Sequence, residues 1–385
     1  MSALHCSVLN TVDDIKEEQW QSLNCETNIY FNKALFKAFE NANQHIEFNY
    51  ILVLNKEEKA VAIATLQILP IDVDSIATNL SFSERINHKL SCFFRKNQVK
   101  VLFCGNVFVS GEHGIFVSSH ADSKATFKAL SKCIKTISTD HSKGIDVIFI
   151  KDFKEESLKL TDQFTSYRYS RLEVEPNMIL ELTHSFSSFE EYKSQLKSKY
   201  RVKVNKADQK SEILETKPLD VNAIKSLLPE LQRLYENTVS KSNFNAQILN
   251  LETYLNLKYS YQNEFIIQGY FLENKLVGFL SGLVNNKQLD AHFVGIDYNY
   301  NKQYSIYPRI LNDYVRLGFE LNVERVNFGR TASEIKSTLG AVPEDLVCYI
   351  RHKKSITNLF LKPFFSQISM KPFKQHQPFK TKKEA

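Results

Sequence analysis

The sequence contains the same order of predicted elements twice. Residues 51–69 (ILVLNKEEKAVAIATLQIL) and residues 265–284 (FIIQGYFLENKLVGFLSGLV) each consist of an apolar run, a charged turn and a second apolar run, which is typical of a β-hairpin. In each copy a β-rich run, an amphipathic helix and another strand follow, over residues 101–109, 125–139 and 145–150 in the first copy and 289–296, 308–321 and 323–328 in the second. The repeated order predicts two copies of one α/β unit.

A chain of 385 residues is too long for one core of ordinary size and is typical of a two-domain protein. We expect an N-terminal domain over residues 1–175, a C-terminal domain over residues 176–354 and a basic tail over residues 355–385. Residues 71–99 break the repeated order and are interpreted as an insertion in the first domain. Because strands and helices alternate in each copy, the predicted fold class is α/β with a mixed sheet in each domain.

Local patterns mark the limits of several elements. We expect separate strands over residues 167–175 and 178–184. Ser188 and Glu191 form a capping box, which predicts the start of a single long helix. The tyrosine- and asparagine-rich stretch 297–307 is expected to be a loop.

The composition is that of a globular protein without a secretion signal or a membrane-spanning helix. The N-terminus (MSALHCSVLN) has no basic segment followed by an apolar core, and no apolar run approaches the length of about 20 residues that spans a bilayer. The six cysteines are scattered, with no CxxC pair and no histidine at ligand spacing, so the sequence predicts reduced thiols and no metal site. We therefore expect a cytoplasmic protein.

Positive charge is concentrated in the tail. Of the net charge of +6, residues 362–385 carry +5, from six lysines against Glu384, so the body is close to neutral. This distribution argues against DNA binding and favours a local contact with an anionic partner. Either the tail touches an anionic membrane surface or it has no fixed structure, and the aromatic residues that lie among its lysines are Phe364, Phe365, Phe373 and Phe379.

A set of short motifs stands in a fixed order along the second copy. They are Lys199-Tyr200-Arg201 with Lys206-Ala207, Tyr304-Ser305, Phe328-Gly329-Arg330, Glu334-Ile335-Lys336 and Leu339-Gly340-Ala341. This order resembles the GNAT acyltransferase superfamily and, within it, the tandem Fem-type peptidoglycan aminoacyltransferases and related Fem-like proteins. The resemblance covers residues 180–352 well and residues 1–175 loosely. It implies two tandem GNAT-like domains that transfer an acyl or aminoacyl group to an amine.

The expected donor-binding site differs from the sequence pattern of GNAT enzymes that use CoA. GNAT enzymes that use CoA wrap its diphosphate with a glycine-rich turn at a helix N-terminus, where backbone N–H groups and the helix dipole favour an anion. The corresponding residues 301–307 contain no glycine. Tyr304, Ser305 and Tyr307 are candidate substrate-binding residues there, and the alternative is a polar loop with a capping serine. We expect no bound cofactor, and acyl-CoA and aminoacyl-tRNA are the candidate donors.

Acyl transfer to an amine requires a group that accepts the amine proton. His292 lies in a predicted strand two residues after Asp290, so period-two geometry puts both side chains on one face. We interpret them as the candidate base and its partner, with Tyr304 as a proton donor to the leaving group. The alternative is a hydrogen-bonded core histidine. His113, beside Glu112 in a turn, is expected to be exposed and to have no catalytic role.

Two groups of cationic residues are candidates for anion binding. Arg330 and Lys336 flank Thr331 at a predicted strand-to-helix corner, a usual ligand position in α/β proteins. The alternative is that they are solvated or pair with Glu334. The second group lies on the helix after the capping box and comprises Lys197, Lys199, Arg201, Lys203, Lys206 and Lys210.

Tyr200 and Arg201 are predicted to bind substrate, because the resemblance to Fem-type proteins implies a basic region here for aminoacyl-tRNA or another anionic substrate. Lysine and arginine contacts to phosphate are the physical basis for such binding. The alternative is a solvated helix face.

These observations predict an N-acyltransferase or aminoacyltransferase that uses an activated ester or thioester. The resemblance implies a small-molecule, cell-wall or other glycoconjugate acceptor. One alternative is a CoA-dependent N-acyltransferase for a small molecule or a lipid. The other is a GNAT-like protein without catalytic activity that binds an anionic partner.

Overall fold

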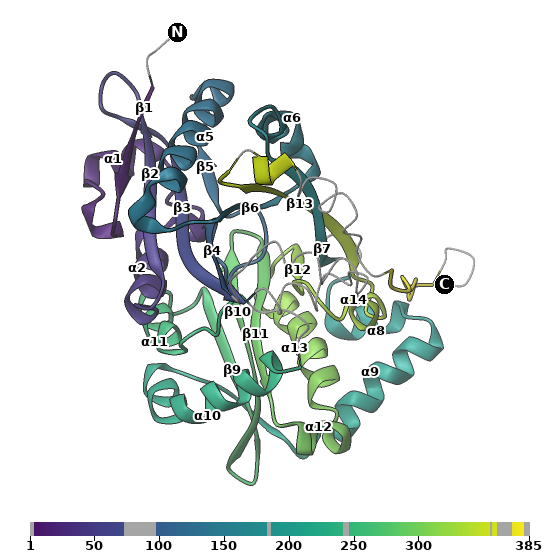
Figure 1. Cartoon of the computed structure of the whole chain (residues 1–385). Coiled ribbons are helices and arrows are strands. Elements are labelled where there is room, and N and C mark those ends of the chain that lie inside the picture. The colour runs from purple at the N-terminus through teal and green to yellow at the C-terminus, as the bar shows by residue number, and fades with distance from the viewer. Residues whose placement is uncertain are drawn as a thin grey trace. The chain divides into compact units, whose positions relative to one another are not determined.

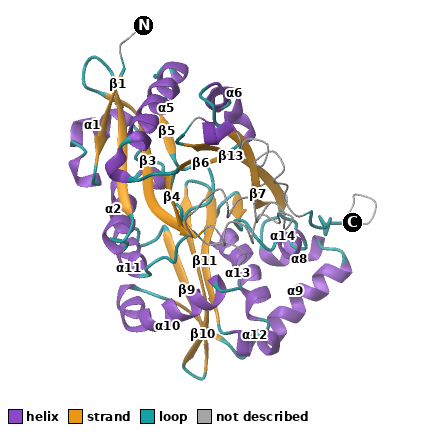
Figure 2. Ribbon diagram, viewed as in Figure 1, coloured by secondary structure: helices purple, strands orange, loops and turns teal. Residues whose placement is uncertain are grey.

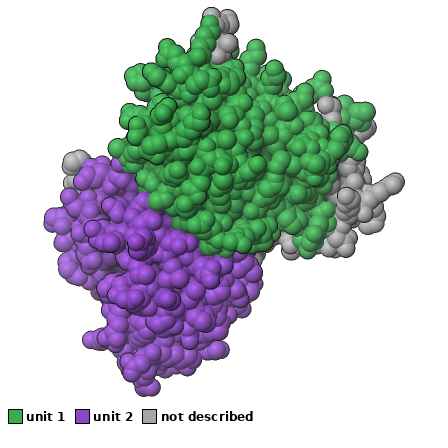
Figure 3. Space-filling view, turned by 90° about the vertical axis from the view of Figure 1, so that its left-hand side faces the viewer, with its two compact units in different colours: residues 1–175, 243–247, 345–371 green, residues 176–242, 248–344, 372–385 purple. Residues whose placement is uncertain are grey.

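Figure 1 shows the computed structural model of the protein, which describes residues 4–72, 98–182, 186–241, 246–354, 356–359 and 372–380. Packing divides the chain into two compact units (Figure 3). Unit 1 comprises residues 1–175, 243–247 and 345–371, and unit 2 comprises residues 176–242, 248–344 and 372–385. Each unit combines helices with both parallel and antiparallel strand pairs (Figure 2), which confirms the predicted α/β class with mixed strand directions.

Unit 1 contains strands in the order β1-β2-β3-β4-β6-β13, with β5 beside β3. The strands are β1 (His5–Leu9), β2 (Glu47–Leu54), β3 (Ala60–Asp72), β4 (Gln98–Cys104), β5 (Ile115–Val117), β6 (Val147–Phe153) and β13 (Val342–His352, in this unit from Asp345). The helices are α1 (Glu17–Leu23), α2 (Lys33–Ala42), α5 (Ser123–Thr139), α6 (Leu158–Thr161) and α7 (Gln163–Ser166). β4 and β6 are parallel, whereas β2 and β3 are antiparallel.

Local side-chain hydrogen bonds explain two of these elements. The hairpin predicted at residues 51–69 is β2 and β3, and in its turn Asn55 Oδ1 accepts the N–H groups of Glu57 and Lys59 at 2.9 and 3.0 Å. Asp122 caps α5 by accepting a backbone N–H at 3.1 Å. The buried apolar residues of α5 recur every three or four positions, as the amphipathic pattern predicts: Phe127, Leu130, Ile134 and Ile137.

One strand of unit 1 comes from far along the sequence. Residues 345–354, which we expected in the C-terminal domain, pack with unit 1 because Val347–His352 pairs antiparallel with β6. Tyr349 is fully buried there, its ring contacts Phe153, and its hydroxyl donates to Asp162 Oδ1 at 2.6 Å.

The predicted insertion over residues 71–99 begins and ends in strands. β3 runs to Asp72, β4 begins at Gln98, and these two residues pair with each other. The remainder of the insertion, residues 73–97, lies outside the described residues.

Unit 2 contains strands in the order β7-β12-β11-β10-β9-β8. The strands are β7 (Ser170–Glu181, in this unit from Pro176), β8 (Glu215–Pro218), β9 (Phe265–Leu272), β10 (Lys275–Asn285), β11 (Gln288–Ile296) and β12 (Arg325–Asn327). The helices are α8 (Phe189–Gln195), α9 (Ser198–Lys210), α10 (Val221–Val239), α11 (Glu252–Ser260), α12 (Tyr298–Tyr304), α13 (Ile306–Glu320) and α14 (Ser333–Ser337). β11 and β12 are parallel, and the β9–β10–β11 neighbours are antiparallel.

The second predicted hairpin is confirmed as β9 and β10. Its turn residues Glu273 and Asn274 have φ values of 49° and 68°, as the left-handed residues of a type I′ turn require. Asp220 accepts the N–H of Ala223 at 2.8 Å and caps α10.

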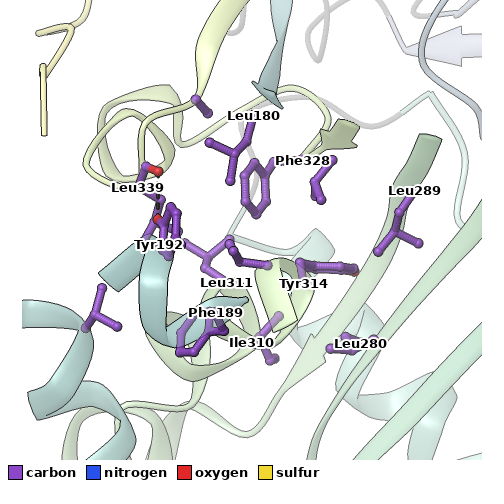
Figure 4. Close-up of a cluster of buried hydrophobic side chains, with 14 of the residues drawn as sticks. Leu180, Phe189, Tyr192, Leu280, Leu289, Ile310, Leu311, Tyr314, Phe328 and Leu339 are labelled. Carbon is purple, nitrogen blue, oxygen red and sulfur yellow. Dashed lines mark hydrogen bonds between the residues drawn. The ribbon is translucent and has the colours of Figure 1, made fainter. Parts of the chain in front are cut away.

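The core of unit 2 lies between the sheet and α13 (Figure 4). Leu180, Leu280 and Leu289 from the strands pack with Ile310 and Tyr314 from α13, and all five are buried. Burial of an aliphatic side chain of this size contributes about 1.5–3 kcal/mol. This layer therefore fixes α13 against the strands that carry the candidate site.

Two predicted limits are wrong. The strands expected at residues 167–175 and 178–184 are joined in one strand, β7 (Ser170–Glu181), which includes Pro176; a proline is tolerated where no partner needs its N–H. Residues 183 and 184 of the second expected strand lie outside the described residues. The expected loop over residues 297–307 forms α12 and the start of α13. Tyr300 and Tyr304, one turn apart, pack against the core cluster, so tertiary packing outweighs the weak helical signal.

The tail segment 372–380 returns to unit 2 and interrupts the helix that we expected to be continuous after Ser188. Lys197 N–H donates to Pro378 O at 2.8 Å, and Lys380 N–H donates to Gln195 O at 2.9 Å. These bonds hold Leu196 extended between α8 and α9.

The aromatic residues of this tail segment face the protein. Phe373 and Phe379 pack against the core cluster of unit 2 and are partly buried there. Phe364 and Phe365 lie outside the described residues. Within the described parts of the chain, no helix is long and apolar enough to cross a membrane.

We predict that Phe379→Ala lowers the free energy of unfolding of unit 2 by about 2–3 kcal/mol, because a partly buried ring leaves a cavity. The Phe379 ring contacts Phe186 and Tyr192 and covers Gly340, where an added Cβ would lie 2.4 Å from it. Urea denaturation measures the change. Gln377→Ala, at an exposed position of the same segment, is the control, and equal stability of the two variants would contradict docking of this segment.

Candidate functional site

β11 and β12 separate at the centre of unit 2. They pair over three positions only, from Gln288↔Arg325 to Asp290↔Asn327. β12 then ends, whereas β11 continues to Ile296 beside β10. Beyond Asp290, the β11 backbone therefore has a strand edge that β12 does not cover. Such an edge offers N–H and C=O groups to an extended ligand.

A β-bulge lies directly after this point. Ser281 of β10 faces two residues of β11, His292 and Phe293, because the neighbouring pairs are Leu280↔Val294 and Gly282↔Ala291. The side chains that face the core cluster accordingly change parity across the bulge: Leu289 and Ala291 before it, Val294 and Ile296 after it. Bulges of this kind are common beside active sites, where they re-aim a side chain.

Ser281 stabilises the bulge through its hydroxyl. Its Oγ donates to Phe293 O at 2.8 Å and accepts the N–H of Phe293 at 3.2 Å. The serine is fully buried. One side chain thus satisfies two backbone groups where the regular pairing of β10 and β11 is interrupted.

The imidazole of His292 is turned toward α11. Its Nδ1 lies 3.0 Å from the hydroxyl of Tyr254, which in turn lies 2.7 Å from Ser281 Oγ. Phe293 contacts Tyr235 of α10, with 4.8 Å between ring centroids. Burial raises the pKa of Tyr254 well above its ordinary value, so its hydroxyl keeps its proton.

Asp290 joins the two separating strands. Its Oδ1 accepts from Gln288 Nε2 at 2.6 Å and from Asn327 Nδ2 at 2.8 Å. Asn327 Oδ1 accepts the N–H of Gly329 at 2.9 Å. The buried carboxylate therefore connects β11 to the loop after β12.

Arg330, Thr331 and Lys336 belong to one loop and the helix after it. Gly329, Thr331 and Ala332 have φ values of 70°, 64° and 50°, and left-handed backbone at a β-branched residue is strained. The buried Lys336 holds this loop, because its Nζ donates to Gly329 O at 3.1 Å and to Arg330 O at 2.6 Å. Thr331 is exposed.

This loop lies beside β11. A Cβ added at Gly329 would be 3.9 Å from the carbonyl oxygen of Ala291. The structure therefore brings Asp290 and the Arg330 loop together where β11 and β12 separate, two residues before His292.

The predicted residues Tyr200 and Arg201 have structural partners on α8, α14 and the tail segment. The Tyr200 hydroxyl lies 3.1 Å from His376 Nδ1, and His376 Nε2 lies 3.3 Å from Glu334 Oε1 of α14. Arg201 donates to the carbonyls of Ser194 and Leu196 at 3.4 and 3.3 Å. Both side chains secure α9 against its neighbours.

Tyr304, Ser305 and Tyr307 form a separate group at the junction of α12 and α13. Ser305 has a φ of 51° and makes no capping bond through its side chain. Tyr304 Oη accepts from Gln303 Nε2 at 2.9 Å. Burial raises the pKa of Tyr307, so that its hydroxyl also stays protonated. These residues follow the end of β11, roughly 13 Å of strand beyond His292.

Protein side chains occupy the helix N-termini at this junction. Asp297 Oδ1 accepts the N–H of Asn299 at 3.2 Å, and Asn301 Oδ1 accepts the N–H of Tyr307 at 2.9 Å. Pro308 has no N–H to offer. An anion placed here would compete with the Asp297 carboxylate for the same positive end.

A cavity of about 420 Å³ opens elsewhere in unit 2. It is lined by Leu228, Pro229 and Gln232 of α10 with Ile248, Leu249, Asn250 and Glu252, and none of the predicted residues contributes to it. No group of three or more His, Cys, Asp or Glu side chains in the described regions is placed to hold a metal ion.

Three residues of the site were missed from the sequence: Ser281, Tyr254 and Asn327. Ser281 carried a usable signal, because it is the one hydroxyl in the apolar run VGFLSGLV. A lone polar residue in a buried strand needs a specific hydrogen-bond partner.

His113 of unit 1 is not exposed as expected. Its ring stacks on Tyr30 with 3.6 Å between centroids and 19° between planes, and its Nδ1 is buried. Burial, with a smaller contribution from Lys154, lowers the pKa of His113 to about 3.

No protein-family model and no curated protein matches the sequence. Solved structures match along most of the chain. FemX shares 10% identity and a TM-score of 0.52, covering 87% of this chain and 96% of its own. A tandem GNAT protein from the clavulanic acid biosynthesis pathway shares 9% identity and a TM-score of 0.52, covering 91% and 99%. L-PGS from Bacillus licheniformis shares 10% identity and a TM-score of 0.50, covering 91% and 97%. The chain therefore has the predicted tandem GNAT, Fem-like fold.

We predict that Lys336→Met lowers the free energy of unfolding by about 2 kcal/mol, because two hydrogen bonds from a charged donor to the strained loop are lost. Trypsin cleavage after Arg330 should become faster, since the loop opens more often. Denaturant titration and limited proteolysis measure both effects. The exposed Lys302→Met controls for loss of a lysine, and unchanged proteolysis at Arg330 would contradict this role of Lys336.

We predict that His113 makes unit 1 sensitive to mild acid. Its folded pKa lies below the unfolded value of about 6.5, so the stability due to its neutral form is present above that value and decreases as the pH falls toward 3. His113→Phe should lose less stability between pH 7 and pH 5 than the wild type. Thermal melts across this range test the difference, with exposed His120→Phe as control.

Proposed function

We propose that unit 2 transfers an acyl or aminoacyl group to an amine where β11 and β12 separate. The observation that carries this proposal is the β-bulge of His292 and Phe293, directly beyond the last pair of the two strands. The backbone of β11 beyond the end of β12 is the candidate source of N–H groups for a carbonyl oxygen that becomes negative in the transition state. The tandem GNAT, Fem-like fold supports this class of reaction.

In this scheme His292 takes a proton from the ammonium group of the acceptor. The neutral amine attacks the carbonyl carbon of the donor, the C–N bond forms, and the bond to the ester oxygen or thioester sulfur breaks. The leaving group takes up a proton. Asp290 and Asn327 keep the ends of the two strands in place, and the Arg330 loop is the candidate contact for an anionic part of the substrate.

The donor side favours an aminoacyl ester, such as aminoacyl-tRNA, over acyl-CoA. The helix N-termini at residues 297–307 are occupied by Asp297 and Asn301, so they do not resemble a diphosphate site. Four lysines are exposed along α9 and offer contacts to a phosphate backbone: Lys199, Lys203, Lys206 and Lys210. The Fem-like resemblance suggests an amine on a cell-wall or glycoconjugate precursor as the first acceptor.

The same exposed lysines also support the second candidate, a protein that binds an anionic partner without catalysis. The two functions differ in one respect that can be measured. A transferase forms a covalent product, whereas a binding protein only retains its ligand.

The test is to incubate the full-length protein with amine acceptors and either an aminoacyl-tRNA pool or a set of acyl-CoAs, and to detect products by mass spectrometry. We expect a product with the aminoacyl ester. His292→Gln should lower its rate roughly 10²–10⁴-fold, the range attributed to general base catalysis.

His120→Gln, at an exposed position in unit 1, is the control and should retain the wild-type rate. A product that forms equally fast with His292→Gln would refute the role of His292. Binding of tRNA that depends on Lys203 and Lys206, without any product, would favour the second candidate.

A further inference from the structure

We infer that Ser281 and Tyr254 are positioning residues that keep the neutral imidazole of His292 in the tautomer with its proton on Nδ1. The basic lone pair is then on Nε2. The importance of this tautomer for catalysis rests on the proposed function, but the tautomer itself follows from the hydrogen bonds of the bulge.

The donor and the acceptor in each of these hydrogen bonds can be assigned in turn, starting from Ser281. A serine hydroxyl has one proton and two lone pairs. The proton goes to Phe293 O at 2.8 Å, and one lone pair accepts the N–H of Phe293 at 3.2 Å. Toward Tyr254, 2.7 Å away, the serine can therefore only accept. Hence the proton of the Tyr254 hydroxyl points to Ser281.

Counting protons and lone pairs in the same way assigns the donor in the hydrogen bond between Tyr254 and His292. The Tyr254 hydroxyl has used its single proton, and as a buried phenol with a raised pKa it does not ionise. Toward His292 Nδ1, 3.0 Å away, only its lone pairs remain. Two acceptors do not form a hydrogen bond, so Nδ1 must carry the proton. A neutral imidazole with a proton on Nδ1 has its lone pair on Nε2.

The consequence is a base whose reactive atom is defined before substrate arrives. After Nε2 takes a proton, the imidazolium still donates from Nδ1 to Tyr254. The donor and the acceptor therefore stay the same in every hydrogen bond between His292 and Ser281. A buried carboxylate plays the orienting role in Ser-His-Asp sites. Here the neutral phenol of Tyr254 orients the His292 ring. The backbone carbonyl of Phe293 fixes the donor and the acceptor in each hydrogen bond of the series.

The test is ¹⁵N NMR of the full-length protein labelled at histidine, which distinguishes the two ring nitrogens by chemical shift and long-range couplings. His292→Gln identifies the signals of residue 292. In the wild type we expect Nδ1 of His292 to be protonated and Nε2 to be unprotonated. A wild-type spectrum with the proton on Nε2 overturns the inference, and this outcome needs no further variant.

Two substitutions test the hydrogen bonds from Ser281 through Tyr254 to His292. Tyr254→Phe removes the acceptor, so both tautomers should appear. Ser281→Ala frees the Tyr254 proton, which should then point to Nδ1 and move the histidine proton to Nε2. Tyr259→Phe, at a position of α11 that is 77% exposed, should leave the spectrum unchanged. An unaltered spectrum in Tyr254→Phe overturns the inference.

The NMR outcome is independent of turnover, so failure of the two proposals can be told apart. If His292→Gln has full activity while the spectra follow the expected pattern, the proposed function fails and the tautomer assignment stands. If His292→Gln is inactive but the proton lies on Nε2, the function stands and this inference fails.

Discussion

The hydroxyl of Ser281 stabilises the β-bulge between β10 and β11 in unit 2, and the candidate site depends on this bulge. It bonds both backbone groups of Phe293, where the pairing of β10 with β11 is interrupted. A buried backbone group without a partner costs about 1–3 kcal/mol, so the irregular strand persists because this side chain compensates for it. The apolar layer under α13 fixes the strands on either side. Its contacts also explain the change of side-chain parity, since Ala291 and Val294 both reach the same core.

Polar groups rather than apolar packing hold the other half of the site. Asp290, Asn327 and Gly329 form one hydrogen-bonded connection, and the Lys336 ammonium closes the strained loop by bonding its carbonyls. Burying these charges has a cost, which their hydrogen bonds offset. These bonds fix the loop beside the part of β11 that β12 does not cover, and the proposed reaction requires such a fixed surface to hold the donor carbonyl.

Local signals in the sequence predicted much of the fold. The turn at Glu273 and Asn274, the amphipathic helix over residues 125–139 and the two hairpins depend on near neighbours. His292 and Asp290 could be selected as chemically capable residues in a strand. The bulge could not be predicted, because it depends on Ser281 in another strand. Lys336 illustrates the same limit: its sequence context resembles that of a substrate contact, whereas its ammonium bonds carbonyls that only the folded loop brings near.

The return of residues 372–380 to unit 2 has a consequence for how this protein is synthesised. Lys197 and Gln195 obtain backbone partners from Pro378 and Lys380, which lie far along the sequence from them. Unit 1 likewise receives β13 from residues far along the sequence. A ribosome releases the N-terminal part first, yet neither unit can finish its structure until these later residues have been synthesised. During synthesis, each unit therefore exposes an incomplete core that the cell must shield from aggregation.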